Sequence, residues 1–62
     1  MVTYDEISIE RINQAHESYA PLMDSDTDAC EQIRDNQWAM VANGQADMDA
    51  AFVMAVEGHS AT

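Results

Sequence analysis

The stretch DSDTDACEQIRD, which runs from Asp24 to Asp35, holds the residues of this chain best suited to bind a metal ion. Its acids stand at the first, third, fifth and twelfth positions, where a calcium-binding EF-hand loop places most of its side-chain ligands. Such a loop also needs glycine at the sixth position and a bidentate glutamate at the twelfth. This stretch has Ala29 and the shorter Asp35 there. An acidic calcium-binding protein is therefore the weaker interpretation.

The same acids are typical of a helix start. Ser25, Asp26 and Thr27 are all good N-cap residues. Carboxylates at and just inside a helix N-terminus are stabilised by its unpaired amides and dipole, each by about 0.3 to 1 kcal/mol. Asn43 followed by Gly44 is a typical C-terminal stop. The pattern predicts a helix over about 27–43 and no metal site. One side of this helix carries the acids, and the other is expected to hold Cys30, Ile33, Gln37, Met40 and Val41.

Other residues with reactive side chains give weaker signals. His16 has no second His, Cys or acid at a metal-ligand spacing on its face, so a partly buried histidine beside Tyr19 is expected. Cys30 is expected to be a small core residue. The chain has no Gly-rich phosphate loop, nucleophile elbow or paired metal motif. We therefore expect neither an enzyme nor a cofactor.

Length and charge limit the class of protein further. Sixty-two residues form at most one small domain, over 1–62, and a single cysteine closes no internal disulfide. The formal charge is -10 with no lysine, which disfavours direct binding to nucleic acid or to anionic membranes and favours a basic protein partner. The N-terminus is acidic and no apolar run is long enough to span a membrane, so a soluble, cytoplasmic protein is expected.

Two further helices are predicted on either side of the helix over 27–43. Thr3 and Glu6 form a Thr-x-x-Glu capping box, and Pro21 is disfavoured inside a helix, so the first helix is expected over about 4–19. Its apolar face should hold Ile9, Ile12, His16 and Tyr19, with Ile7 outside that face.

The third helix should begin after Asp47 and end near Glu57, with Gly58 as the stop and 59–62 as a loose tail. Its run AAFVMAV is apolar nearly all round, so it needs cover on two sides. We expect the first two helices to cover one side and a second copy of the chain to cover the other. The predicted fold is all-α, a small bundle of three short helices completed by homodimerisation. The predicted core consists of Ile9, Ile12, Ile33, Met40, Val41, Phe52, Ala55 and Val56.

The acids also form two rows at helical spacing, and these carry the first functional hypothesis. One row holds Glu6, Glu10 and Glu17, and the other holds Asp28, Glu31 and Asp35 followed by Trp38. With neighbours about 4.5 to 10 Å apart along a helix, each row is sparser than a DNA strand but of comparable reach.

The rows therefore suggest a small inhibitor that imitates nucleic acid and occupies a basic, nucleic-acid-binding surface of an enzyme or complex. Phages and mobile elements often encode small acidic proteins that work in this way, and the analogy is one of class only. The alternative is a homodimeric structural or regulatory interaction module whose acidity serves solubility.

Overall fold

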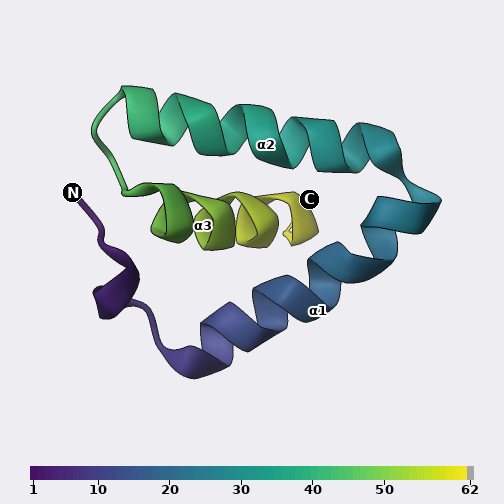
Figure 1. Cartoon of the computed structure of the whole chain (residues 1–62), viewed down its shortest axis with the longest axis horizontal. Coiled ribbons are helices and arrows are strands. Elements are labelled where there is room, and N and C mark those ends of the chain that lie inside the picture. The colour runs from purple at the N-terminus through teal and green to yellow at the C-terminus, as the bar shows by residue number, and fades with distance from the viewer. Residues whose placement is uncertain (62) are drawn as a thin grey trace.

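A computed structural model describes residues 1–61 of the chain, and these residues form three α-helices (Figure 1). They are α1 (Ile9–Ser25), α2 (Thr27–Ala42) and α3 (Met48–Ser60), preceded by the one-turn 3-10 helix η1 (Tyr4–Glu6). The β pairing within residues 1–61 is limited to one isolated bridge between Val2 and Ala46. The predicted all-helical fold with three helices is confirmed.

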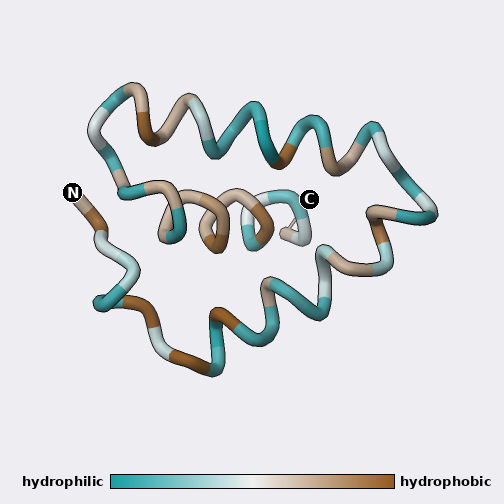
Figure 2. Tube along the Cα trace, viewed as in Figure 1, coloured by the Kyte–Doolittle hydropathy of each residue, from teal (hydrophilic) through white to brown (hydrophobic). Residues whose placement is uncertain are grey.

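Helix α3 lies between α1 and α2 and forms the centre of the core (Figure 1). Its trace is apolar over most of its length, whereas α2 carries many hydrophilic residues (Figure 2). Five of its thirteen residues are buried: Ala50, Ala51, Val53, Ala55 and Val56. The prediction that α1 and α2 cover the third helix is confirmed, and the N-terminal segment adds further cover through Val2 and Ile7.

The predicted boundaries of the second helix hold to within one residue. Asp26 is the N-cap of α2, and its Oδ1 accepts a hydrogen bond from the backbone N–H of Ala29 at 3.1 Å. Asn43 is the C-cap, and Gly44 follows with a φ of +69°, a left-handed conformation that favours glycine. Acids at this helix start therefore act as the capping pattern predicts.

The predicted start of the first helix is wrong. Thr3 and Glu6 do interact, through a 3.0 Å hydrogen bond from Thr3 Oγ1 to Glu6 Oε1, but the turn they enclose is the 3-10 helix η1. Ile7 then takes an extended conformation, and α1 begins only at Ile9. Its N-cap is Ser8, whose Oγ accepts a hydrogen bond from the backbone N–H of Arg11 at 3.3 Å.

The predicted end of the first helix is also wrong, because α1 continues through Pro21 to Ser25. Proline has no N–H to donate to the carbonyl four residues earlier, but that carbonyl belongs to the exposed Glu17, where water can take its place. Leu22, one residue further on, packs against the core. This contact lies beyond the proline and holds the last turn of α1 on the bundle.

The inward face of α1 differs from the predicted one. The side chains that face inward follow each other at spacings of three, four and three: Ile12, Ala15, Tyr19 and Leu22. Ile9 was predicted to be in the core but is 75% exposed, and His16 is exposed as well. Around the helix, Ile9 and His16 lie on one side of Ile12, and Ala15 and Leu22 lie on the other. The predicted face omitted Ala15 and Leu22, so its centre was placed too far toward Ile9 and His16.

The remaining core predictions have mixed outcomes. Ile33, Ala55 and Val56 are buried as expected, whereas four others are only partly buried against the core: Ile12, Met40, Val41 and Phe52. Gly58 does not end the third helix, which continues through His59 to Ser60. The tail predicted over 59–62 is therefore helical over its first two residues, and Thr62 lies outside the described residues.

The N-terminal segment is held against the connection between α2 and α3. The Val2 N–H donates to the Gln45 carbonyl at 2.9 Å, and the Asp47 N–H donates to the Val2 carbonyl at 3.0 Å. Ile7, expected to lie outside the apolar face, is buried in the core instead. Residues 1–8 therefore form a clasp that returns the start of the chain to the N-terminus of α3 (Figure 1).

Asp47 joins the clasp to α3 through both of its carboxylate oxygens. Oδ1 caps α3 by accepting from the Ala50 N–H at 2.8 Å, and Oδ2 accepts from the Tyr4 N–H at 2.9 Å. These backbone hydrogen bonds hold the pKa of Asp47 below its ordinary value. Because the folded-state pKa is the lower one, the stabilisation is present above the unfolded-state pKa of about 3.9 and is lost as the pH falls through the folded-state value.

We therefore predict that Asp47→Asn lowers the melting temperature at neutral pH. The amide keeps one oxygen for the cap and has an NH2 group in place of the second acceptor, so the bond from Tyr4 is lost. The gap between the melting temperatures of parent and variant should narrow as the pH is lowered from 6 to about 3. A gap that stays constant with pH would show that the Asp47 charge does not contribute.

Candidate functional site

The outer side of α2 carries one of the two predicted acidic rows. Asp28, Glu31, Asp35 and Trp38 are all exposed, and the indole of Trp38 is 60% exposed. The opposite side of α2 is turned to the core, where Ile33 is fully buried. The predicted division of α2 into an apolar side and an acidic side is confirmed, because spacings of three and four keep the row on one face.

The acids of the α2 row also form no ion pair with a described residue. Within residues 1–61, one ion pair forms between side chains, and it joins Arg11 to Glu57 and includes no α2 acid. From Asp28 to Trp38 the helix rises about 15 Å at 1.5 Å per residue. Three carboxylates therefore precede one large aromatic ring along a single helix.

The other predicted row is not continuous. Glu6 lies on η1 and accepts the hydrogen bond from Thr3, whereas Glu10 and Glu17 lie on α1 and are two turns apart. All three side chains are exposed. Because the chain is extended at Ile7, the helical spacing that placed Glu6 with the other two does not apply.

The acidic stretch from Asp24 to Asp35 does not form a loop. Asp24 and Ser25 end α1, Asp26 is both the C-cap of α1 and the N-cap of α2, and the rest of the stretch is helical. Among the described residues, no group of three or more His, Cys, Asp or Glu side chains is placed to hold a metal ion. The carboxylates are spread along two helices and do not converge on a point.

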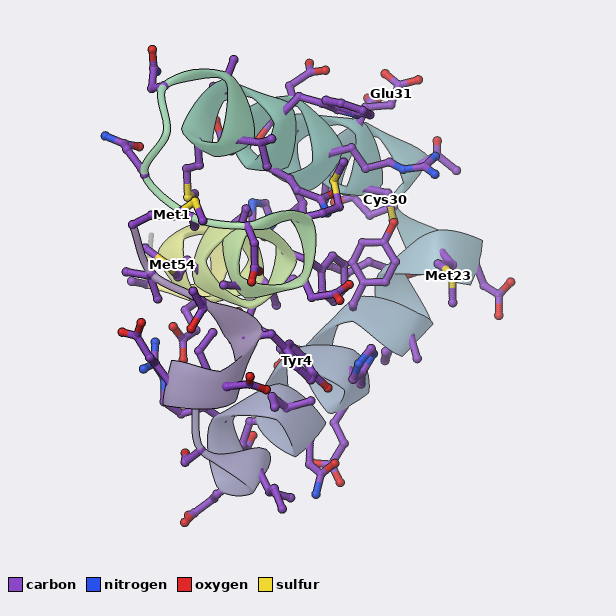
Figure 3. The ribbon with its side chains drawn as sticks, turned by 60° about the vertical axis from the view of Figure 1, so that its left-hand side comes forward. Met1, Tyr4, Met23, Cys30, Glu31 and Met54 are labelled. Atoms are coloured by element: carbon purple, nitrogen blue, oxygen red, sulfur yellow. The ribbon has the colours of Figure 1, made fainter. Side chains whose placement is uncertain are left out.

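A hollow of about 450 Å³ lies beside the acidic row, where the end of α1 meets the start of α2, and sequence reasoning did not find it. Met23 lies at the end of α1, Cys30 points toward the gap between the two helices, and Glu31 points outward from α2 (Figure 3). The hollow is lined by Tyr19, Met23, Thr27, Cys30, Glu31 and Arg34.

Tyr19 forms the inner wall of this hollow. Its ring meets the ring of Phe52 edge-on with centroids 4.9 Å apart, and Phe52 also contacts the His16 ring at 5.5 Å. Burial, with a hydrogen bond between Tyr19 and Cys30, raises the pKa of the Tyr19 hydroxyl. Cys30, expected to be a small core residue, is only partly buried and lines the hollow.

The two arginines have different surroundings. The guanidinium of Arg11 is fixed to Glu57 of α3 by two hydrogen bonds, Nε to Oε2 at 2.9 Å and NH2 to Oε1 at 2.7 Å. This hydrogen-bonded ion pair raises the pKa of Arg11 and lowers that of Glu57. Arg34 stands at the hollow, with Glu31 three residues before it on α2.

Comparison with known proteins adds no relationship. No family model matches the chain, and neither a curated protein nor a solved structure matches it. Within residues 1–61, none of the helices combines the length and apolar character that crossing a membrane requires.

Proposed function

We propose that this protein is an inhibitor that occupies a basic, nucleic-acid-binding surface of a partner protein. The observation that carries the proposal is the outer face of α2, where Asp28, Glu31 and Asp35 are exposed, unpaired and followed by exposed Trp38. A net charge of -10 adds a long-range attraction to basic surfaces. The α2 row takes the place of a short run of phosphates, and Trp38 supplies the contact that charge alone lacks.

The two acidic rows can be compared at equal net charge. One variant carries Asp28→Asn, Glu31→Gln and Asp35→Asn, and a matched control carries Glu6→Gln, Glu10→Gln and Glu17→Gln. Each change removes three negative charges, so a difference between them reports position and not total charge. Both variants must first show the circular dichroism and melting behaviour of the parent.

The parent and both variants would be immobilised and exposed to native host lysate at low salt. We expect the parent to retain a protein that duplex DNA displaces. The α2 variant should not retain this protein. Its binding should weaken steeply as salt rises, because exposed charges are screened. Equal retention by the parent and the α2 variant would contradict the proposal, and selective loss from the control would move the contact to the Glu6, Glu10 and Glu17 side.

Trp38→Ala should act on a different step from the acids. Once the partner is known, this variant should mainly speed dissociation, with a loss of about 2 kcal/mol or more, because truncating an aromatic anchor removes buried contact. The amide variant of the α2 row should mainly slow association and flatten its salt dependence. Trp38→Phe is the control that keeps an aromatic ring. An Ala variant with the parent's dissociation rate would exclude Trp38 from the contact.

A homodimeric interaction module is the second candidate. The chain itself already covers most of α3, so a second copy is not needed there. The observation that favours a dimer is now Ile9, an aliphatic side chain that is 75% exposed. We expect sedimentation at micromolar concentration to show a species of twice 6.9 kDa that Ile9→Ser dissociates. A 6.9 kDa parent at high concentration would exclude the dimer.

A further inference from the structure

We infer that the hollow between the end of α1 and the start of α2 is an anchor pocket for one apolar side chain of the partner, flanked in that partner by basic residues. The inference rests on the proposed function, because it takes the partner to be basic. It adds a specific feature to the partner: the basic surface must present an aliphatic or aromatic side chain among its lysines and arginines.

The position of the hollow relative to the acidic row is the first argument. Thr27, Glu31, Arg34 and Trp38 follow each other on α2 at spacings of four, three and four, so they share one face of the helix. The first three line the hollow, and Trp38 stands one turn beyond Arg34. Glu31 belongs to both features, and a partner that covers the acidic row therefore also covers the hollow.

The residue types around the hollow are the second argument. Protein interfaces are enriched in aromatic residues, Met and Arg, and place them inside a polar rim. Tyr19, Met23 and Arg34 line the hollow, and Met23 is 55% exposed although it is apolar. The carboxylates of Asp28, Glu31 and Asp35 stand along α2 beside it as the charged surround.

The chemistry of the lining selects the occupant. The lining includes the Tyr19 ring, the Met23 thioether and the Cys30 thiol, which suit an apolar side chain. The two charged groups of the lining, the Glu31 carboxylate and the Arg34 guanidinium, are of opposite sign, so the hollow has no net charge that would favour a charged occupant. The neighbouring α2 carboxylates attract basic residues on either side of the occupant. An apolar side chain between basic neighbours satisfies both conditions.

Two matched peptides test this inference without the natural partner. The full chain would be titrated at low salt with the peptides KKLKK and KKAKK, both acetylated and amidated, and binding followed by amide chemical shifts and by the fluorescence of the single tryptophan. The peptides have equal charge, so the ratio of their dissociation constants reports the leucine side chain. We expect KKLKK to bind about three- to tenfold more tightly, in keeping with partial burial of the added carbons.

A methionine pair provides the matched control variants. Met23→Gln makes the hollow polar with little change in size, and it should bring the KKLKK to KKAKK ratio close to one. Met48→Gln changes an exposed methionine at the start of α3, outside the hollow, and should leave the ratio unchanged. Equal binding of the two peptides to the parent, or a ratio that Met23→Gln leaves intact, would overturn the inference.

The same titration separates this inference from the proposed function. Suppose that the parent binds KKLKK more tightly than KKAKK, and that the amide variants of the two acidic rows reduce the affinity for both peptides by the same factor. The anchor pocket is then supported, and the special role of the α2 row is contradicted. Suppose instead that the parent binds the two peptides equally, and that only the α2 amide variant has a reduced affinity for them. The role of the α2 row is then supported, and the anchor pocket is contradicted.

Discussion

Ile33→Ala is expected to lower the free energy of unfolding by about 2 to 5 kcal/mol, because it empties the best-buried site of the core. Ile33 has 0% exposure and lies on the inward side of α2, among the largest fully buried side chains. A domain of 62 residues has a total stability of about 3 to 9 kcal/mol at typical values per residue. The variant should therefore be largely unfolded under mild conditions.

The matched control for this prediction is Ile9→Ala. The side chain lost is the same, but Ile9 is 75% exposed, so at a protein concentration where sedimentation shows a monomer the change should stay within about 0.5 kcal/mol. Urea denaturation followed by far-ultraviolet circular dichroism measures both. Equal losses for the two isoleucines would contradict the packing described above. Phe52, the more obvious core residue by sequence, is only partly buried, so Ile33 is the sharper test.

Ala51→Leu is expected to destabilise the protein by about 1 to 3 kcal/mol or more, because α3 has no space for a larger side chain at this position. Ala51 is 0% exposed, and α3 is packed against both α1 and α2. Small buried residues on α3, namely Ala50, Ala51 and Ala55, let the two neighbouring helices approach it closely. Added carbons force the helices apart or force strained rotamers.

Ala39→Leu is the control for the overpacking prediction. Ala39 lies on the exposed side of α2, and leucine and alanine are both good helix formers. This variant should melt within a few degrees of the parent, whereas Ala51→Leu should melt well below it. If Ala51→Leu were as stable as the parent, α3 would be less tightly enclosed than its burial indicates.

Local patterns in the sequence were sufficient to determine α2 and its two sides. Its N-cap, its C-terminal glycine and its apolar and acidic spacings all act within a few residues, so they need no knowledge of the rest of the chain. The acidic row of Asp28, Glu31 and Asp35, with Trp38 beyond it, was predictable for the same reason. Asp47 as the start of α3 follows from the same kind of local signal.

The tertiary structure decided the features that depend on contacts between distant residues. Whether α1 passes Pro21 depends on Leu22 meeting the core, which no local rule reports. Ile7 is buried because Val2 pairs with the connection at Gln45 and Ala46, more than forty residues away. The hollow beside the acidic row exists only because Tyr19 and Met23 of α1 come to lie against α2. Sequence periodicity describes one helix at a time, whereas each of these features depends on contact between two segments that are far apart in the sequence.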